Sequence, residues 1–504
     1  MNIPALPGFR LILFLYTLFA FGYSLLMPMW EAPDETAHYL VVLHLAKEGT
    51  MPTMDETYEA AQPPPYYWLV AQLLRLLGAI NPELIQLYRP HLSLGDTLTR
   101  YHWTAENYRI IWGVQILRWL NIAWGGLALF FVHKGVTRFT STAIRPDMPD
   151  HHVEARRLLP LATVAVMGLL PQFLYNSASF SNDPPANAAG ACLFWLLSVV
   201  SSTQMGIRGR VAITAAALAF PPLIKFTILP LSLTILFALL RQEWQQYRTH
   251  RAQVVVGMVL LTLFLGGCIN WLWPESAILL WRSFVWRVTY IRPGAFSGWP
   301  LWNIVTFYVT SYWGQVGWKD AGLPGWSIVS LMSLAWLGWL ASLRLLLPHW
   351  TPRRFWGWLF TLLILVSASG IYLYRANPWW RVPGPIILCV VGVWLLAYWR
   401  FNHSDPAYTL AFTGWSWSMV WLVAGLSLFG IIKNGLVTPQ YQGRFLFPAL
   451  GALSLLIITG WYTLLPPRAR PYLPHIVITL HIGLNFLLWF TRVIPIYYQP
   501  FWAN

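Results

Sequence analysis

Residues 11–38, LILFLYTLFAFGYSLLMPMWEAPDETAH, join an uncharged apolar run to a cluster of acids and a histidine. The run at 11–29 is about as long as a helix that crosses a bilayer, and Arg10 is the only charged side chain before it. No small-residue cleavage site follows before Trp30, so we expect a retained membrane anchor rather than a removed signal peptide. The polar cluster would then emerge at the membrane surface.

The composition of the whole chain is typical of a protein that crosses the membrane many times. Of 504 residues, 57% are hydrophobic and 10% are charged, which excludes a water-soluble enzyme because so few charged residues cannot cover so apolar a chain. Aromatic residues reach 16%, including 32 Trp, and Trp and Tyr favour the two membrane–water interfaces. Cys192, Cys268 and Cys389 lie in apolar runs, so neither a disulfide framework nor a thiolate metal site is expected.

Apolar runs bounded by charges or by Pro and Gly predict an all-α polytopic membrane protein with about 13 transmembrane helices. The runs lie at 11–29, 108–132, 158–178, 186–203, 211–224, 226–240, 253–273, 326–347, 355–373, 383–399, 409–432, 445–465 and 474–491. The pair on either side of Lys225 is short and is interrupted by Pro221 and Pro222, so we expect a broken hairpin that reaches only part of the way across. No internal repeat or low-complexity linker divides the chain, and residues 1–504 are predicted to form one integral membrane domain.

The net charge of +15 follows the positive-inside rule when the N-terminus is placed in the cytoplasm. Most of the excess Lys and Arg then falls in short cytoplasmic connections, whereas bases and acids nearly balance in the external segments. Nucleic acid is not needed as a partner, because no basic stripe with interleaved aromatics lies free of the predicted spans. The expected location is the cytoplasmic membrane, with membrane lipids as partners.

Two predicted external segments are long, at 30–107 and 274–325, whereas the cytoplasmic connections are short. We therefore expect the chemistry on the external, periplasmic side. In the first segment, 33–48 begins with Pro and is followed by Gly49, and 63–77 begins with three prolines. Both stretches are predicted to be interfacial helices that lie at the membrane surface.

The densest polar cluster lies at 31–38. Asp34 and His38 are four residues apart and would share one helix face, with Glu35 beside Asp34 at the helix N-terminus. A carboxylate there could act as general base toward an acceptor hydroxyl, or bind a divalent cation together with His38. The alternative is that these acids only cap a surface helix. We treat Asp34, Glu35 and His38 as candidate catalytic residues, with the choice of base and the presence of a metal left open.

Three other groups of polar residues are expected on the same external side. Asn182 and Asp183 follow the third predicted span, where they either line a site or cap the next helix. Lys225 is a cation between two half-helices, a position that indicates a function unless the side chain reaches the surface. Gln442 and Arg444 precede a late span, where a guanidinium can bind a phosphate or anchor the helix at the interface. These five are candidate substrate-binding residues.

Five motifs occur in an order that resembles a family of bacterial membrane proteins, which is similar to the GT-C superfamily of glycosyltransferases. They are PDETAH at 33–38, SND at 181–183, the break at Lys225, SYWGQVGW at 311–318 and QGRFLFP at 442–448. The resemblance covers nearly the whole chain. It implies an inverting transfer of a sugar from a polyprenyl-phosphate-linked donor to a glycan, lipid or protein acceptor on the outer face.

The resemblance also implies roles for single residues. In such transferases an acid of the first external loop, here Asp34, is the base or lies beside the reacting centre, and basic residues hold the donor phosphate. By position, Arg444 and Lys225 would do so. Two features depart from the pattern. Gln62 stands where related transferases carry His before Pro-Pro, and two prolines follow Asp183 where small helix formers are typical.

Two other classes of protein stay open on the sequence alone. Half-helices around a single Lys also describe a transporter with a midplane site, although the acids gather in a loop and no inverted repeat is visible. A lipid-linked glycan polymerase or ligase would use the same donor class, but it normally has its large loop late in the chain. The transferase interpretation requires Asp34, Lys225 and Arg444 to line one outward cavity.

Overall fold

The computed structural model describes residues 8–78, 80, 108–143, 150–202, 205–246, 301–317, 321–343, 345, 414–437 and 442–498, together with isolated positions between 257 and 285. These residues are mostly helical, as the all-α prediction requires. Besides turns and loops, these ranges contain the two-residue strands β1 (Gln315–Val316) and β2 (Ala321–Gly322), which pair in antiparallel fashion.

Seven helical stretches in these ranges are long and apolar enough to cross a membrane, which makes the chain an integral membrane protein. They are α1 (Phe9–Leu26), α4 (Tyr108–Ala143), α7 (Asp183–Ser202), α13 (Gly325–Leu343), α16 (Gly414–Val437), the pair η8 (Gly443–Ala449) and α17 (Leu450–Leu464), and the series η9 (Pro467–Tyr472), α18 (Leu473–Leu488), η10 (Trp489–Val493) and α19 (Ile494–Tyr498). The predicted spans at 355–373 and 383–399, and most of 253–273, lie outside the described residues. The total of about 13 spans therefore stays a prediction.

One predicted span is not continuous. The run at 158–178 is divided between α5 (Asp150–Leu169) and α6 (Pro171–Ser177), which meet at an angle of 64°. Pro171 has no amide proton, and it favours the extended conformation that Leu170 adopts, with φ −60° and ψ 120°. Because of this bend, α6 leads into the turn before α7, where two of the predicted site residues lie.

The predicted interruption at Lys225 is present. α8 (Ile207–Leu223) ends two residues before it, and η4 (Phe226–Ile228) and α9 (Leu229–Gln246) follow it. α8 and α9 pack against each other, and α9 also packs on α7 and α16. That this hairpin reaches only part of the way across a bilayer remains a prediction.

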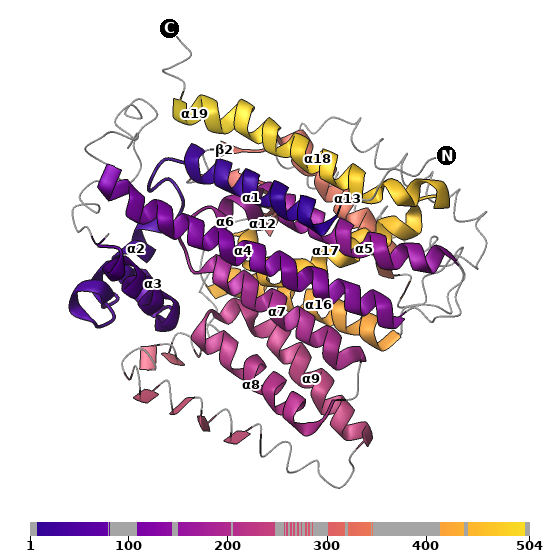
Figure 1. Cartoon of the computed structure of the whole chain (residues 1–504), viewed down its shortest axis with the longest axis horizontal. Coiled ribbons are helices and arrows are strands. Elements are labelled where there is room, and N and C mark those ends of the chain that lie inside the picture. Colours follow the sequence, from indigo (N-terminus) through magenta and orange to yellow (C-terminus); the bar gives the residue numbers. More distant parts are fainter. Residues whose placement is uncertain are drawn as a thin grey trace.

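The first predicted external segment contains both expected helices. α2 (Glu35–Glu48) and α3 (Pro64–Leu76) pack together, with the short helix η1 (Tyr58–Ala61) between them in the chain. Buried side chains such as Tyr39 and Tyr67 give this pair a hydrophobic core separate from that of the main bundle. Figure 1 shows α2 and α3 beside the bundle, near the beginning of α4. Their depth at the membrane surface stays a prediction.

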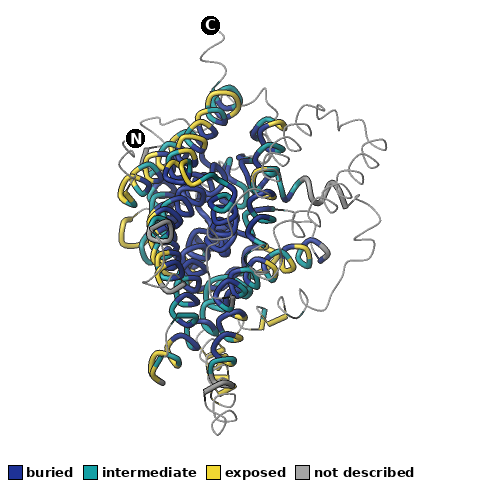
Figure 2. Tube along the Cα trace, turned by 90° about the vertical axis from the view of Figure 1, so that its right-hand side faces the viewer, coloured by how far each residue is buried: buried dark blue, intermediate teal, exposed yellow. Residues whose placement is uncertain are grey.

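The main core lies where the long helices pack closely. α4 packs along α7, and α13 packs along α17. A Cβ added at Gly460 of α17 would lie 1.7 Å from the carbonyl oxygen of Gly338 in α13. Small residues permit such close approach in membrane bundles, where helix association depends on packing. Figure 2 shows buried residues in the middle of the bundle and exposed residues toward its outside.

One further helix helps to position the site. α12 (Leu301–Trp313) leads into β1 and packs on η8 and α6. η8 in turn packs on α7 and η4. The turn between α6 and α7, the break at Lys225 and the start of η8 are thereby brought to one region of the molecule.

Candidate active site

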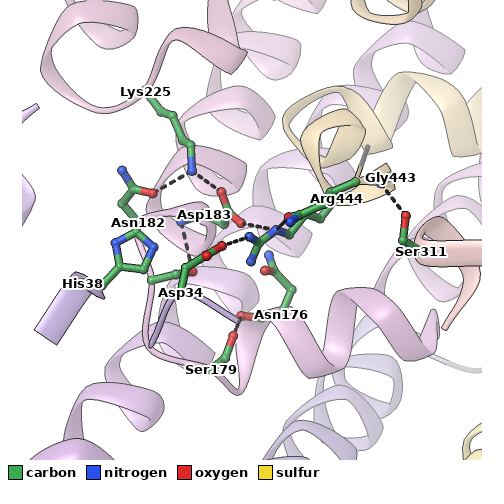
Figure 3. Close-up of polar contacts among 12 residues, drawn as sticks. Asp34, His38, Asn176, Ser179, Asn182, Asp183, Lys225, Ser311, Gly443 and Arg444 are labelled. Atoms are coloured by element: carbon green, nitrogen blue, oxygen red, sulfur yellow. Dashed lines mark hydrogen bonds and ion pairs between the residues drawn. The ribbon is translucent and has the colours of Figure 1, made fainter. Parts of the chain in front are cut away.

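Four segments that are far apart in the sequence bring charged side chains together (Figure 3). The four residues, called the charge cluster below, are Asp34 immediately before α2, Asp183 at the start of α7, Lys225 in the break after α8 and Arg444 in the first turn of η8. The sequence predicts that these positions lie on one side of the membrane. The structure places their side chains in direct contact with one another.

Ion pairs link the charge cluster into a chain. Arg444 donates from Nη2 to Oδ2 of Asp34, and its Nε lies 3.4 Å from Oδ2 of Asp183. Lys225 donates from Nζ to Oδ1 of Asp183, and also to Oδ1 of Asn182 over 2.7 Å. Two cations and two carboxylates therefore alternate, and the charge cluster is electrically balanced.

The charge cluster is shielded from solvent. Its four side chains keep between 7% and 19% of their surface exposed. Charges taken out of water are costly unless they are paired, and the attraction between them is stronger than at an open surface. Each cation contacts a carboxylate, so an anionic ligand would compete with that carboxylate for the cation.

Neutral side chains orient both cations. Asn182 accepts from Lys225 and donates from Nδ2 to Oε1 of Gln62 over 3.1 Å. Gln442 accepts from Nε of Arg444. Gln62 thus contacts the charge cluster through Asn182.

Close packing of η8 on α12 fixes the backbone next to Arg444. The amide of Gly443 donates to Oγ of Ser311 over 2.8 Å. A Cβ at Gly443 would lie 2.5 Å from the carbonyl oxygen of Tyr308 and 2.6 Å from the amide nitrogen of Tyr312. Only glycine fits at this position, which accounts for the contact between the motifs at 311–318 and 442–448.

Asp34 has an unusual backbone conformation and a lowered pKa. Its φ is 68°, in the left-handed region that few non-glycine residues adopt. Its Oδ1 accepts a hydrogen bond from the hydroxyl of Tyr58 over 2.7 Å. Burial by itself would raise the pKa of the Asp34 carboxyl, but the Arg444 guanidinium and the Tyr58 hydroxyl outweigh burial and lower it. Asp34 is therefore ionised near neutral pH.

His38 lies beside the charge cluster and is 2% exposed. Its Nδ1 lies 2.7 Å from the hydroxyl of Tyr67 and 3.7 Å from Oε2 of Glu59. Burial lowers the pKa of His38, and the neighbouring carboxylate of Glu59 offsets this effect only in part. The ring is therefore neutral near pH 7 and is able both to donate and to accept a hydrogen bond.

Glu35 does not join the charge cluster. Its carboxylate is fully buried and forms a bidentate pair with Arg118, with N···O distances of 2.8 and 2.7 Å. The backbone amides of Trp30 and Phe180 donate to the same carboxylate over 3.1 and 2.9 Å. Four donors occupy this acid, which the sequence suggests, together with Asp34, as a candidate catalytic residue. The geometry favours an anchoring role for Glu35 instead.

Arg118 is an important charged residue that lies outside the sequence motifs. It is 3% exposed in α4, and it also donates to the carbonyl oxygens of Ser24, Met27 and Pro28 over 2.8 to 3.1 Å. It thereby ties the end of α1 and the turn before α2 to Glu35. One signal in the sequence points to it, because a charged residue inside an apolar run is costly unless it is paired.

The chemistry of the charge cluster favours an anionic oxygen ligand. Within the described ranges, no group of three or more His, Cys, Asp or Glu side chains is arranged to hold a metal ion. Asp34 contacts Arg444 and Tyr58, and His38 contacts Tyr67. The ammonium and the guanidinium are groups that bind phosphate oxygens through charge-assisted hydrogen bonds.

No protein-family model matches the chain, and no curated protein matches it. A solved structure with some similarity is the crystal structure of ArnT from Cupriavidus metallidurans bound to undecaprenyl phosphate. The two chains are 14% identical with a TM-score of 0.41, and the match covers 98% of this chain and 75% of that chain.

Proposed function

We propose that this chain is an inverting glycosyltransferase of the GT-C type, which moves a sugar from a polyprenyl-phosphate-linked donor to an acceptor outside the membrane. The observation that carries the proposal is the charge cluster beside membrane-length helices, in which two shielded cations both contact Asp183 and one of them, Arg444, also contacts the Asp34 carboxylate. A leaving lipid phosphate requires cations, and an attacking hydroxyl requires a base. The order of the sequence motifs supports the same function.

Lys225 and Arg444 would bind the donor phosphate. An ammonium and a guanidinium both form charge-assisted hydrogen bonds to phosphate oxygens, and the guanidinium can form two in parallel. The phosphate would displace the carboxylates of Asp183 and Asp34 from the two cations. Because the charge cluster is shielded from water, negative charge that develops on the leaving phosphate would be stabilised strongly.

Asp34 would act as the base in a single displacement. The acceptor oxygen attacks the anomeric carbon while the bond from that carbon to the phosphate oxygen breaks, so the configuration inverts. The hydroxyl proton passes to Asp34, and the bonding electron pair leaves with the phosphate. When the phosphate engages Arg444, the effect of the guanidinium on Asp34 weakens, and burial raises the pKa of the carboxyl. Donor binding would thus make Asp34 a stronger base.

The other predicted site residues would support these two roles. Asn182 and Gln442 would orient the cations that they contact. His38 would hydrogen-bond the acceptor near the base. Glu35 would fix the start of α2, and with it the position of the base, through its pair with Arg118.

The proposed orientation places the N-terminus in the cytoplasm and the charge cluster toward the periplasm. The excess of Lys and Arg in the short connections supports it. A long isoprenoid tail requires an apolar path between helices, and the membrane-length helices supply apolar surface of that kind. The acceptor would be a glycan, a lipid or a protein.

Tyr58→Phe should move the acidic limb of the pH dependence of kcat/KM to higher pH. The substitution removes a hydrogen bond that favours the ionised carboxylate, so the pKa of Asp34 rises and the base is lost earlier as the pH falls. Tyr58 is 48% exposed, so the change opens no core cavity. Tyr472→Phe, at a residue 37% exposed in η9, is the control. An acidic limb at the wild-type pH would mean that Tyr58 does not act on the base.

Arg444→Met should weaken binding of undecaprenyl phosphate to the purified protein by about tenfold or more, because a charge-assisted hydrogen bond contributes roughly 1.5–3 kcal/mol. The dissociation constant can be measured by titrating the lipid into detergent-solubilised protein. The matched control is Arg241→Met, which removes a guanidinium that stacks on Trp415 at 3.5 Å from the ring centroid.

Equal affinity of the wild type and Arg444→Met for the lipid would remove Arg444 from the phosphate site. A second measurement distinguishes a transferase from a transporter. If the wild type binds the lipid but transfers no sugar, and instead moves lipid-linked sugar across the membrane of proteoliposomes, the transporter alternative is favoured.

A further inference from the structure

Asn176, near the end of α6, carries a buried amide that the proposed reaction does not yet use. Its side chain is 1% exposed, and its Nδ2 has no hydrogen-bond partner among the residues that the structure describes. Figure 3 shows this side chain directed toward the pair formed by Asp34 and Arg444. A buried, unpaired amide next to a candidate active site requires an explanation.

The local turn does not need this amide. The backbone carbonyl of Asn176, not its side chain, accepts from Oγ of Ser179 over 2.9 Å and from the Ser179 amide over 3.4 Å. On the other side, the hydroxyl of Tyr175 accepts from the amide of Gly317 over 3.1 Å. The backbone and its neighbours hold the segment, so the side chain contributes no hydrogen bond from Nδ2 to the fold described here.

Burying a polar group without a partner lowers the stability of the fold. A carboxamide N–H is a neutral donor, and it suits a neutral oxygen such as a sugar hydroxyl. The phosphate already has two cations for its charge in the proposed reaction. In Figure 3, Asn176 lies on the opposite side of the Asp34–Arg444 pair from Lys225, away from the second of these cations.

We infer that Nδ2 of Asn176 donates a hydrogen bond to an oxygen of the transferred sugar, and this assignment rests on the proposed function. Asn176 is then a specificity-determining residue. A donor sugar with an oxygen at the matching position would bind, and one without that oxygen would leave the amide unpaired and bind less well.

Asn176→Leu tests the inference, because Leu has a similar size and has no hydrogen-bond donor. Affinity should be measured for two lipids: undecaprenyl phosphate, and the polyprenyl-phosphate sugar that the wild type consumes fastest from a donor panel. The variant should bind the sugar-linked donor about tenfold more weakly, which corresponds to about 1.4 kcal/mol, and bind undecaprenyl phosphate as the wild type does. The melting temperature without ligand should be unchanged or higher, because an unpaired polar group is removed.

Ser454→Ala is the matched control. Ser454 lies in α17, is fully buried and also has a side-chain oxygen without a hydrogen-bond partner among the described residues. It is not part of the charge cluster. This variant should bind both lipids with wild-type affinity. A loss of donor affinity in Asn176→Leu is then specific to Asn176 and is not a general effect of removing a buried polar group.

Three results would overturn the inference. Unchanged affinity of Asn176→Leu for the sugar-linked donor would show that the amide does not contact the sugar. An equal loss for both lipids would assign the amide to the phosphate instead. A lower melting temperature with normal donor binding would assign it to the fold. If the wild type itself binds neither lipid, the proposed function fails and the inference fails with it, whereas the first three results leave the proposed function intact.

Discussion

Asp34→Asn should lower the rate of sugar transfer by roughly two to four orders of magnitude, the usual contribution of a general base. Asn cannot take the proton of the acceptor hydroxyl. The fold should survive, because Asn is among the non-glycine residues that tolerate the left-handed backbone found at this position. Binding of undecaprenyl phosphate should be unchanged or tighter, because an amide competes less well than a carboxylate for Arg444. Transfer is measured with a radiolabelled donor, and lipid binding is measured separately.

Asp55→Asn is the control for this experiment. Asp55 is an exposed acid in the same predicted external segment, and its variant should transfer sugar at the wild-type rate. A near-normal rate in Asp34→Asn would remove Asp34 as the base. If the variant loses lipid binding as well as transfer, Asp34 maintains the structure of the phosphate site and is not shown to transfer a proton.

Arg118→Met should lower the free energy of unfolding by about 3–5 kcal/mol, because it leaves the fully buried Glu35 carboxylate without its counter-charge. The same substitution removes the donors to the carbonyl oxygens of Ser24, Met27 and Pro28, which join the end of α1 to the turn before α2. Unfolding can be followed by tryptophan fluorescence in detergent. The loss should be accompanied by loss of transfer, because Asp34 is adjacent to Glu35.

A double variant distinguishes the effect of the unpaired charge on stability from the effect of the lost contacts. Glu35→Gln combined with Arg118→Met should recover part of the stability, because no uncompensated charge then remains. Arg10→Met, at an exposed arginine near the start of α1, should be as stable as the wild type. Wild-type stability in Arg118→Met alone would contradict the anchoring role of this pair.

Much of the helical structure is predictable because it depends on local patterns. The stretch from Pro33 to Gly49 carries its own start and stop signals, and α2 ends at Gly49 in a left-handed conformation with φ 77°. Prolines and Lys225 likewise mark the break after α8. The bend at Pro171 is different, because run length and hydrophobicity describe 158–178 as one span, although the proline itself favours a break.

The candidate site is predictable only as a set of polar positions. The pairing of Arg444 with Asp34 joins residues 410 positions apart, so it depends on how the helices pack rather than on any local pattern. Glu35 and Asp34 are neighbours in the chain, yet Glu35 is the first residue of α2, whereas Asp34 precedes the helix with a left-handed backbone, so the two side chains point in different directions. Asp34 therefore contacts Arg444 while Glu35 contacts Arg118. The roles of Tyr58 and Asn176 likewise follow from the packing of η1 and α6 near the charge cluster.

The most direct test of the proposed reaction is the release of polyprenyl phosphate from a panel of radiolabelled polyprenyl-phosphate sugars, with purified wild-type protein and membrane-derived acceptors. We expect the wild type to consume at least one donor and to release one polyprenyl phosphate for each sugar transferred, and we expect Asp34→Asn to release almost none. If neither protein consumes any donor in a broad panel while both bind undecaprenyl phosphate, the lipid site exists but the transferase function is contradicted.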